Sequence, residues 1–311
     1  MGKREFTIPS ADGKTALHAV EWLPEGAPRA VVQISHGVSE YILRYEPFAE
    51  YLTKQGFAVI GNDHLGHGSS VAEGGARLYF GPKGSWNWVV DDLYALRCQT
   101  GKRFPGLPYF LMGHSMGSFL ARTYLIRYPG TVDAAIVMGT GQMAPAIVAG
   151  GRLVAAQQAR RVGETKSSPL VMQLAFGTYN KLFAPNRTAF DWLSVNGENV
   201  EAYVADPLCG ENPSTGLFRE MLGGMAFISK AEHLKKMNAN TPILFLSGSM
   251  DPVGACGKGV EKACASFRKA GVRDVSMKLY PGLRHEILQE GCKALIYQDI
   301  AQWLESKLPV P

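Results

Sequence analysis

The segment 113–117, with the sequence GHSMG, carries the clearest chemistry in this chain because it has the G-x-S-x-G spacing of a nucleophilic serine. An apolar run, Tyr109–Met112, precedes it, and a helical pattern follows it to about Tyr128. A serine between a strand and a helix lies in a sharp turn, where the helix N-terminus favours developing negative charge. The five residues alone would also fit a glycine-rich turn with an ordinary N-cap serine. Their context makes Ser115 the predicted nucleophile.

A serine hydroxyl needs a base to activate it and an acid to orient that base. In a strand–turn–helix site of this kind, the acid and the histidine follow the serine along the chain. Only two histidines do so: His233 lies in a charged run and is expected to be solvated, whereas His285 directly follows a strand pattern. Asp251 also directly follows a strand pattern, so we predict a Ser115–Asp251–His285 triad. Two further aspartates remain candidates for the acid: Asp206 and Asp274.

The tetrahedral intermediate of acyl transfer needs two N–H donors for its oxyanion. One is expected from Met116, the residue after the serine, and the other from an early turn between a strand and a loop. The segment His36-Gly37-Val38 occupies such a turn, which makes the Val38 amide the second candidate. His36 precedes the serine and is expected to fix this loop by hydrogen bonding.

Alternating strand and helix patterns surround these residues and predict an α/β fold. Most of the sheet is expected to be parallel, with helices on both faces. Asp12-Gly13 predicts a hairpin turn between the first two strands. The strands are expected at 6–9, 16–22, 30–35, 57–61, 109–112, 134–138, 242–247 and 275–280. The helices are expected at 47–56, 86–102, from about 117 to 128, 259–269 and 295–304.

The alternation stops between Gly141 and Asn240, where several helical patterns and many large apolar residues occur without a strand pattern. A helical block inserted between two sheet strands would form a cap over one end of the sheet. We therefore expect a core made of residues 1–140 and 241–311, with a helical cap at 141–240. The apolar side chains of the cap fit both a core against the sheet domain and a dry pocket for an alkyl chain.

Composition narrows the class of protein. The chain has 311 residues, is 46% hydrophobic and carries a net charge of +5, with its basic residues scattered. This distribution argues against a nucleic-acid partner. Five cysteines without a C-x-x-C pair favour a reducing compartment and offer no metal framework. We find no signal-peptide pattern and no run of 18 apolar residues, and we expect a cytoplasmic protein without metal or cofactor.

Several motifs together resemble the monoacylglycerol lipase and lysophospholipase branch of the α/β-hydrolase superfamily, which is related to the serine aminopeptidase-like hydrolases. They are HGVSE at 36–40 with Arg44-Tyr45, DHLGHGSS at 63–70, GHSMG at 113–117, GSMD at 248–251, and Gly282 with His285. The resemblance spans essentially the whole sheet domain and implies that His36, Gly37 and Glu40 support the oxyanion turn. His64 and His67 are expected to pack the second loop rather than act in chemistry. The family usually has histidine where this chain has Tyr41.

The resemblance implies a Ser-His-Asp esterase that acts on a lipid with one acyl chain, such as a monoacylglycerol or a lysophospholipid. A general short-chain carboxylesterase and an amide or peptide hydrolase are the alternatives. Glu164, Glu198 and Glu201 would be candidates to hold a substrate amine, although the last two have the spacing of a solvated helix face. The expected partner is a small ester or lipid, with transient contact between the cap and a membrane surface left open. The oligomeric state is not predicted.

Overall fold

The computed structural model describes residues 2–309, which contain an eight-stranded sheet in the order β1-β2-β4-β3-β5-β6-β7-β8. The β1–β2 and β2–β4 pairs are antiparallel, and the other five pairs are parallel. The strands are β1 (Gly2–Pro9), β2 (Ala16–Leu23), β3 (Ala30–Ser35), β4 (Phe57–Asn62), β5 (Tyr109–His114), β6 (Ala134–Met138), β7 (Ile243–Gly248) and β8 (Val275–Tyr280). All eight predicted strands are therefore present.

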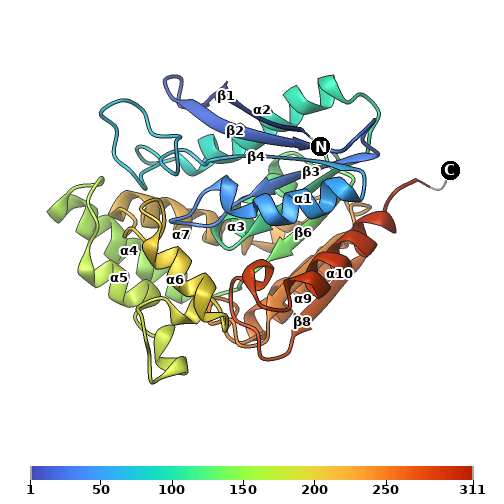
Figure 1. The fold of residues 1–311 in the computed structure, drawn as a ribbon. Helices are drawn as coiled ribbons and strands as arrows, with labels where there is room; N and C mark the ends of the chain where they lie inside the picture. The colour runs from blue at the N-terminus through green and yellow to red at the C-terminus, as the bar shows by residue number, and fades with distance from the viewer. Residues whose placement is uncertain (1, 310–311) are drawn as a thin grey trace.

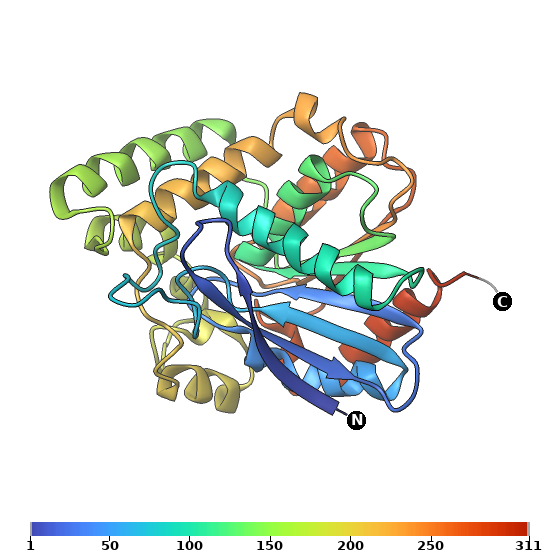
Figure 2. The same ribbon diagram turned by 90° about the horizontal axis from the view of Figure 1, so that it is seen from above.

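Helices cover both faces of this sheet, as Figures 1 and 2 show. On one face lie α2 (Trp86–Arg103), α3 (Met116–Arg127) and α9 (Lys258–Lys269). On the other lie α1 (Glu46–Lys54) and α10 (Lys293–Glu305). Successive residues of a strand face opposite sides of the sheet. In β5, Leu111 lies in the core with α2, α3 and α9, and Phe110 lies in the core with α1 and α10. Because both faces are covered, every residue of β3, β4, β5, β6 and β7 is buried.

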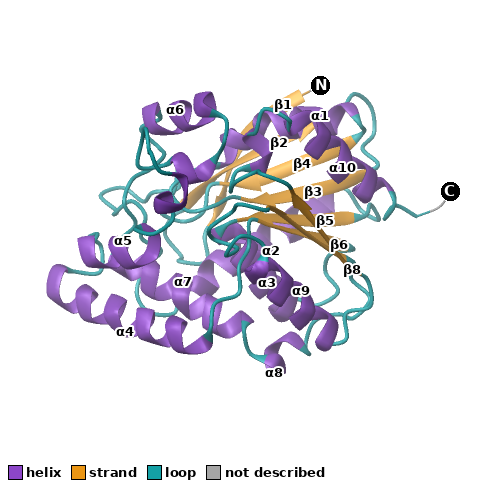
Figure 3. Ribbon diagram, turned by 90° about the horizontal axis from the view of Figure 1, so that it is seen from below, coloured by secondary structure: helices purple, strands orange, loops and turns teal. Residues whose placement is uncertain are grey.

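The helices between β6 and β7 gather beyond one end of the sheet (Figure 3). They are α4 (Pro145–Val162), α5 (Pro169–Phe176), α6 (Gly197–Ala205), α7 (Thr215–Ile228) and α8 (Ala231–Leu234), with short 3-10 turns at Asn180–Phe183 and Asp191–Leu193. Two further 3-10 turns, Ile42–Tyr45 and Ile287–Gln289, belong to the loops after β3 and β8. α7 packs against both α4 and α3, so the inserted helices rest on the helix that follows Ser115.

The first strand differs most from its predicted bounds, since β1 begins at Gly2 instead of Phe6. Gly2 pairs with Leu23 and Lys3 with Trp22. These first residues lie in the edge strand and are exposed, so their polar sequence gives no apolar signal. Hydrogen bonding to β2, rather than burial, extends this strand.

Candidate active site

Ser115 occupies a strained turn between β5 and α3. Its backbone has φ 54° and ψ −121°, in a region that residues other than glycine rarely adopt. The turn is tight enough to require both flanking glycines. A Cβ on Gly113 would overlap the Gly117 carbonyl, and a Cβ on Gly117 would overlap the carbonyls of Ser35 and His36. The local fold is therefore the sharp strand–turn–helix expected from the sequence.

Asp251 and His285 are joined at the ends of two neighbouring strands. Nδ1 of His285 lies 3.0 Å from Oδ2 of Asp251, and the two residues are 2% and 0% exposed. Asp251 also accepts hydrogen bonds from the Ser247 hydroxyl and the Val253 amide. Burial raises the pKa of Asp251, but His285 and these hydrogen bonds outweigh it and hold the pKa below its ordinary value. An ionised Asp251 can thus orient His285, leaving the Nε2 of the imidazole for other contacts.

Ser115 and His285 approach the same point, residues 138–139 at the end of β6. The Ser115 amide donates to the Met138 carbonyl at 3.0 Å. A Cβ on Gly139 would lie 3.1 Å from Cε1 of His285. Within residues 2–309, Ser115 Oγ makes no hydrogen bond to His285.

The other candidates from the sequence lie elsewhere. Asp274 forms an ion pair with Lys307, and Asp206 accepts a hydrogen bond from the Tyr41 hydroxyl. The expectation that His233 is solvated is wrong: its side chain is 17% exposed, because the ring packs on Phe227. Its Nδ1 lies 2.9 Å from the Phe227 carbonyl.

The two candidate oxyanion donors flank the serine. In the described part of the chain, neither the Val38 amide nor the Met116 amide donates a hydrogen bond to another residue. Met116 begins α3, where backbone amides lack partners within the helix. Val38 lies in the turn after β3, and Gly37 in that turn is close enough to Ser115 that a Cβ there would lie 3.1 Å from the Ser115 Cβ. The turn and the serine are therefore neighbours, as predicted.

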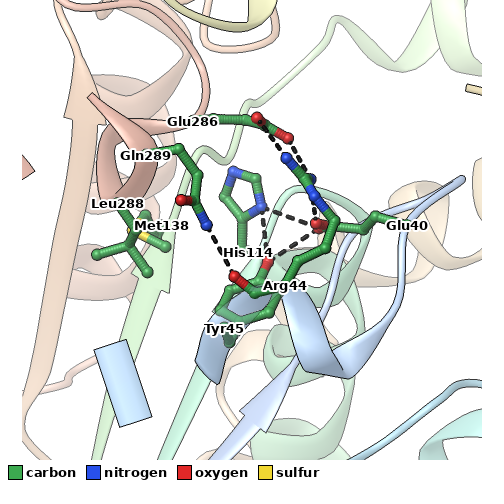
Figure 4. A pocket seen from close by; sticks show the side chains of 8 residues that line it. All are labelled: Glu40, Arg44, Tyr45, His114, Met138, Glu286, Leu288 and Gln289. Carbon is green, nitrogen blue, oxygen red and sulfur yellow. Dashed lines mark hydrogen bonds and ion pairs between the residues drawn. The ribbon is translucent and has the colours of Figure 1, made fainter. Parts of the chain in front are cut away.

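Glu40 anchors this turn through a buried group of charges, shown in Figure 4. One carboxylate oxygen accepts from the Gly37 amide at 2.6 Å and from the Tyr45 hydroxyl at 2.9 Å. The other accepts from Arg44 at 2.7 Å. Arg44 also binds both carboxylate oxygens of Glu286, which directly follows His285. Burial raises the pKa of Glu40, but the hydrogen bond from His114 and the charge of Arg44 outweigh it and keep the carboxylate ionised.

The loop 63–70 is hydrogen-bonded to the turn that carries Val38 and to the residues that follow it. The His36 ring donates from Nδ1 to the Gly37 carbonyl at 2.7 Å and accepts at Nε2 from the His64 amide at 2.9 Å. Asp63 accepts from the Ile42 amide at 2.8 Å. Burial lowers the pKa of His36 and His64, and it lowers that of His67 to about 3, so these rings are neutral. Residues 2–309 hold no group of three or more His, Cys, Asp or Glu side chains arranged to bind a metal ion.

The inserted helices complete the surroundings of the site. The Trp192 ring lies 5.1 Å from the His285 ring, and Phe176 stacks on Trp192. The Leu193 carbonyl accepts from the Glu286 amide at 2.7 Å. Tyr41 lies where the family that the sequence resembles usually has histidine. Its hydroxyl donates to Asp206 and so connects the loop after β3 to the inserted helices. The surface beside His285 is therefore aromatic and apolar.

The sequence did not reveal two members of this site, Glu286 and His114. Glu286 directly follows the predicted base, and its pairing with Arg44 joins loops 242 residues apart in sequence. The i,i+4 spacing of Glu40 and Arg44 was a readable signal for their own ion pair. Neither this spacing nor the position of Glu286 after His285 indicates that Arg44 also pairs with Glu286.

The fold and the site together define an α/β-hydrolase: a mostly parallel sheet whose fifth strand ends in the serine elbow, with Asp and His at later strand ends. The family model described as Serine aminopeptidase, S33 matches residues 26–291, and the chain belongs to this family.

Similar proteins agree over nearly the whole chain. A monoacylglycerol lipase of Mycolicibacterium smegmatis is 30% identical and aligns over 98% of both proteins. The human monoglyceride lipase is 27% identical over 96% of this chain and 90% of its own. The structure of a carboxyl esterase from Bacillus coagulans in complex with glycerol matches with a TM-score of 0.92 at 27% identity, covering 99% of this chain and 100% of that one. The protein is thus a carboxylic ester hydrolase of the monoacylglycerol lipase-like branch.

Proposed function

We propose that this enzyme hydrolyses esters through an acyl-enzyme on Ser115. The observation that carries the proposal is the convergence of the strained Ser115 turn and the hydrogen-bonded Asp251–His285 pair at the same edge of the sheet. His285 takes the Ser115 proton as the hydroxyl attacks the ester carbonyl, and gives it to the departing alcohol. Water, activated by the same imidazole, then releases the acid and regenerates the serine. Asp251 fixes the imidazole orientation throughout.

The Val38 and Met116 amides are the proposed oxyanion donors. Each lies beside Ser115, and their N–H groups have no hydrogen-bond partner in residues 2–309. Fixed donors at this place stabilise the charge that develops on the carbonyl oxygen. Glu40 is proposed to hold the turn that carries Val38, because it accepts the Gly37 amide. His36 fixes the other side of the same turn.

The proposed substrate is a lipid ester with a single acyl chain, of the monoacylglycerol or lysophospholipid type. Residues 141–240 are proposed to form the cap domain, with 1–140 and 241–311 as the core. Phe176, Tyr179 and Trp192 form an aromatic cluster that reaches His285, a surface suited to an alkyl chain. The relatives named as monoacylglycerol and monoglyceride lipases support this class of substrate.

An amide or peptide substrate fits the cap less well. A substrate amine would need a carboxylate with spare hydrogen-bonding capacity near the serine. Glu164 is bound by Arg219 and Tyr79, and Glu201 pairs with Arg187 at the exposed surface. Glu198 is exposed in the first turn of α6. A short-chain carboxylesterase remains the second candidate, because the same site would serve it and the Bacillus coagulans relative is a carboxyl esterase.

Transient membrane contact through the cap is also proposed. Ile147, Leu153, Leu170 and Leu174 of α4 and α5 are between 48% and 74% exposed. Arg160 and Arg161 at the end of α4 are exposed beside them. Apolar side chains next to cations suit an anionic lipid surface. No helix in residues 2–309 is long and apolar enough to cross a membrane. The expected cytoplasmic location stays a prediction that rests on the five free cysteines.

A hydrolysis panel tests the proposal. It compares wild type with Ser115→Ala on p-nitrophenyl esters from acetate to palmitate, and on monoacylglycerol, lysophospholipid and aminoacyl-amide substrates. We expect activity that depends on Ser115 and is highest for medium or long acyl chains. Activity confined to acetate and butyrate would favour the short-chain esterase. Full turnover by Ser115→Ala would overturn the assignment of the nucleophile.

A further inference from the structure

His114, the residue before the proposed nucleophile, is a buried histidine whose two ring nitrogens both face oxygen atoms. Nδ1 lies 3.0 Å from the Tyr45 hydroxyl and 3.3 Å from Oε1 of Glu40. Nε2 lies 3.2 Å from the backbone carbonyl oxygen of His285. The residue is 4% exposed. Figure 4 shows the ring between Glu40, Tyr45 and the loop that carries Glu286.

The hydrogen bonds around this ring require two donors. A backbone carbonyl only accepts, so Nε2 must carry a proton to bind His285. The Tyr45 hydroxyl has one proton, which Oε1 of Glu40 accepts at 2.9 Å. If Nδ1 were unprotonated, its lone pair would face the Glu40 carboxylate. A neutral imidazole has only one N–H, so it satisfies one side of the ring and leaves the other as a contact between two acceptors.

We propose that His114 is a positively charged imidazolium that fastens the oxyanion turn to the backbone of the base loop. Through Glu40 it holds the carboxylate that binds the Gly37 amide, and through Nε2 it holds the His285 carbonyl. Because it directly precedes Ser115, one cation joins the three chain segments on which the proposed function depends. The inference rests on that proposed function. His114 acts through these neighbours and is a positioning residue.

The charges around the ring balance. Glu40 and Glu286 are the two anions of the group, and Arg44 and His114 are its two cations. The other titratable groups near the ring are Tyr45, the His285 ring at 4.7 Å and, further off, His36. Removing His114's proton would leave one negative charge in excess in a buried site, which is costly. A cavity of about 10 Å³ lies between these side chains, and Glu40, His114 and Glu286 are each 5% exposed or less, so the charges have little contact with bulk water.

The electrostatics agree with this geometry. Burial lowers the pKa of His114, but the hydrogen bond and the charge of Glu40 outweigh it and raise the pKa above its ordinary value. The cation is therefore present below this raised pKa. It is lost as the pH rises through the raised pKa, and one of the two contacts is lost with it. The wild-type kcat should then fall on the alkaline side.

The first experiment observes the charge directly and does not depend on turnover. The wild-type protein is labelled with ¹⁵N-histidine, and the protonation of each ring nitrogen is recorded by NMR from pH 6 to 10. At pH 7 we expect both nitrogens to be protonated in His18, whose ring lies between the carboxylates of Glu5 and Asp63, and in His114. The His114 signals are assigned by their loss in His114→Gln and should change to the neutral pattern at pH 7 in Glu40→Gln. A neutral His114 at pH 7 in wild type would overturn the proposal.

The second experiment measures kcat and KM on one soluble ester for wild type, His114→Gln and His233→Gln. Both N–H groups of a glutamine side chain are on one nitrogen, so they cannot replace donors at the two separate ring nitrogens that bind Glu40 and the His285 carbonyl. We expect a fall in kcat of about 10- to 100-fold with little change in KM, as displacements near 1 Å produce, and loss of the alkaline limb. His233→Gln, which also removes a histidine bonded to a carbonyl, should behave as wild type.

The outcomes separate the two proposals. If His114→Gln keeps the wild-type kcat and the same alkaline limb, the positioning role is wrong while the ester hydrolase assignment stands. If wild type hydrolyses no ester, the proposed function fails, but the NMR experiment still decides whether His114 is charged. Should His114→Gln fail to fold, the NMR titration of wild type and the kcat of Glu40→Gln, expected to fall as well, decide instead.

Discussion

The sheet edge that carries Ser115 and the inserted helices α4 and α5 differ in what their surfaces contain. At the sheet edge, Asp251, His285, Glu40 and His114 are all buried, and every one of them is hydrogen-bonded. On α4 and α5, leucines are exposed to solvent, with Leu153 at 74%. Trp192 connects the two regions, because it packs on the His285 ring and on Phe176 of α5.

This difference separates chemistry from substrate choice. A buried, fully paired polar group holds one geometry, because any unpaired charge in it would be costly. Exposed apolar side chains impose no geometry on the site but favour contact with other apolar material. We therefore expect changes at the sheet edge to affect all ester substrates equally. Changes on α4 and α5 should affect only substrates presented in a lipid surface.

The largest predicted effect belongs to Asp251→Asn. The amide keeps the shape but favours the wrong tautomer of His285 and removes the charge that stabilises its protonated form. We expect kcat to fall by about 10⁴-fold on short and long esters alike. Steady-state kinetics on p-nitrophenyl acetate and a monoacylglycerol measure this. A loss restricted to the long-chain substrate would contradict the separation of the two regions.

Asp92, a buried carboxylate away from the site, tests whether pairing of buried carboxylates with cations is a feature of the site alone. Asp92 of α2 is 1% exposed and binds Ser10 and Ala11, and no cation of residues 2–309 pairs with it. Burial raises its pKa to about 7. Native Asp92 is therefore protonated below that pH, whereas the unfolded side chain ionises from about pH 4. The free energy of unfolding consequently falls as the pH rises from about 4 to 7. In Asp92→Asn this loss is absent, since the amide can bind both partners uncharged.

The measurement is urea unfolding of wild type and Asp92→Asn at several pH values. Between pH 5 and 7 we expect wild type to lose about 2 to 3 kcal/mol relative to the variant, as two pH units of a single titration imply. The activity of the folded variant should stay unchanged. Parallel stability curves would show that Asp92 is ionised in the native protein across this range.

The smallest predicted effect belongs to the exposed face of the insertion. In Leu153→Ser with Leu174→Ser, we expect binding to anionic vesicles to fall about three- to tenfold, because two exposed apolar side chains no longer reach the lipid. Activity on a soluble ester should match wild type. Leu295→Ser in α10, at a leucine that is 53% exposed, is the matched control. An equal loss of binding in the control would exclude α4 and α5 as the contact.

Sequence patterns predicted the sheet and the elbow because local chemistry determines both. Strand patterns predicted β3, β6 and β8 with their observed bounds, and the GHSMG motif at 113–117 predicted the turn at Ser115. The contact that requires Gly117 is nevertheless with the distant carbonyls of Ser35 and His36. The pairing of Arg44 with Glu286 could not be predicted, since it depends on how loops 242 residues apart meet. His233 was mispredicted for a different and local reason, because its charged neighbours concealed its packing on Phe227.

The most direct test of the central claim is covalent labelling of the nucleophile. An alkyl fluorophosphonate captures an activated serine as a stable ester, and the intact mass and a peptide map locate it. We predict one adduct per chain on Ser115, none in Ser115→Ala, and much slower labelling in Asp251→Asn. An adduct on another residue, or undiminished labelling of Ser115→Ala, would contradict the proposed acyl-enzyme mechanism.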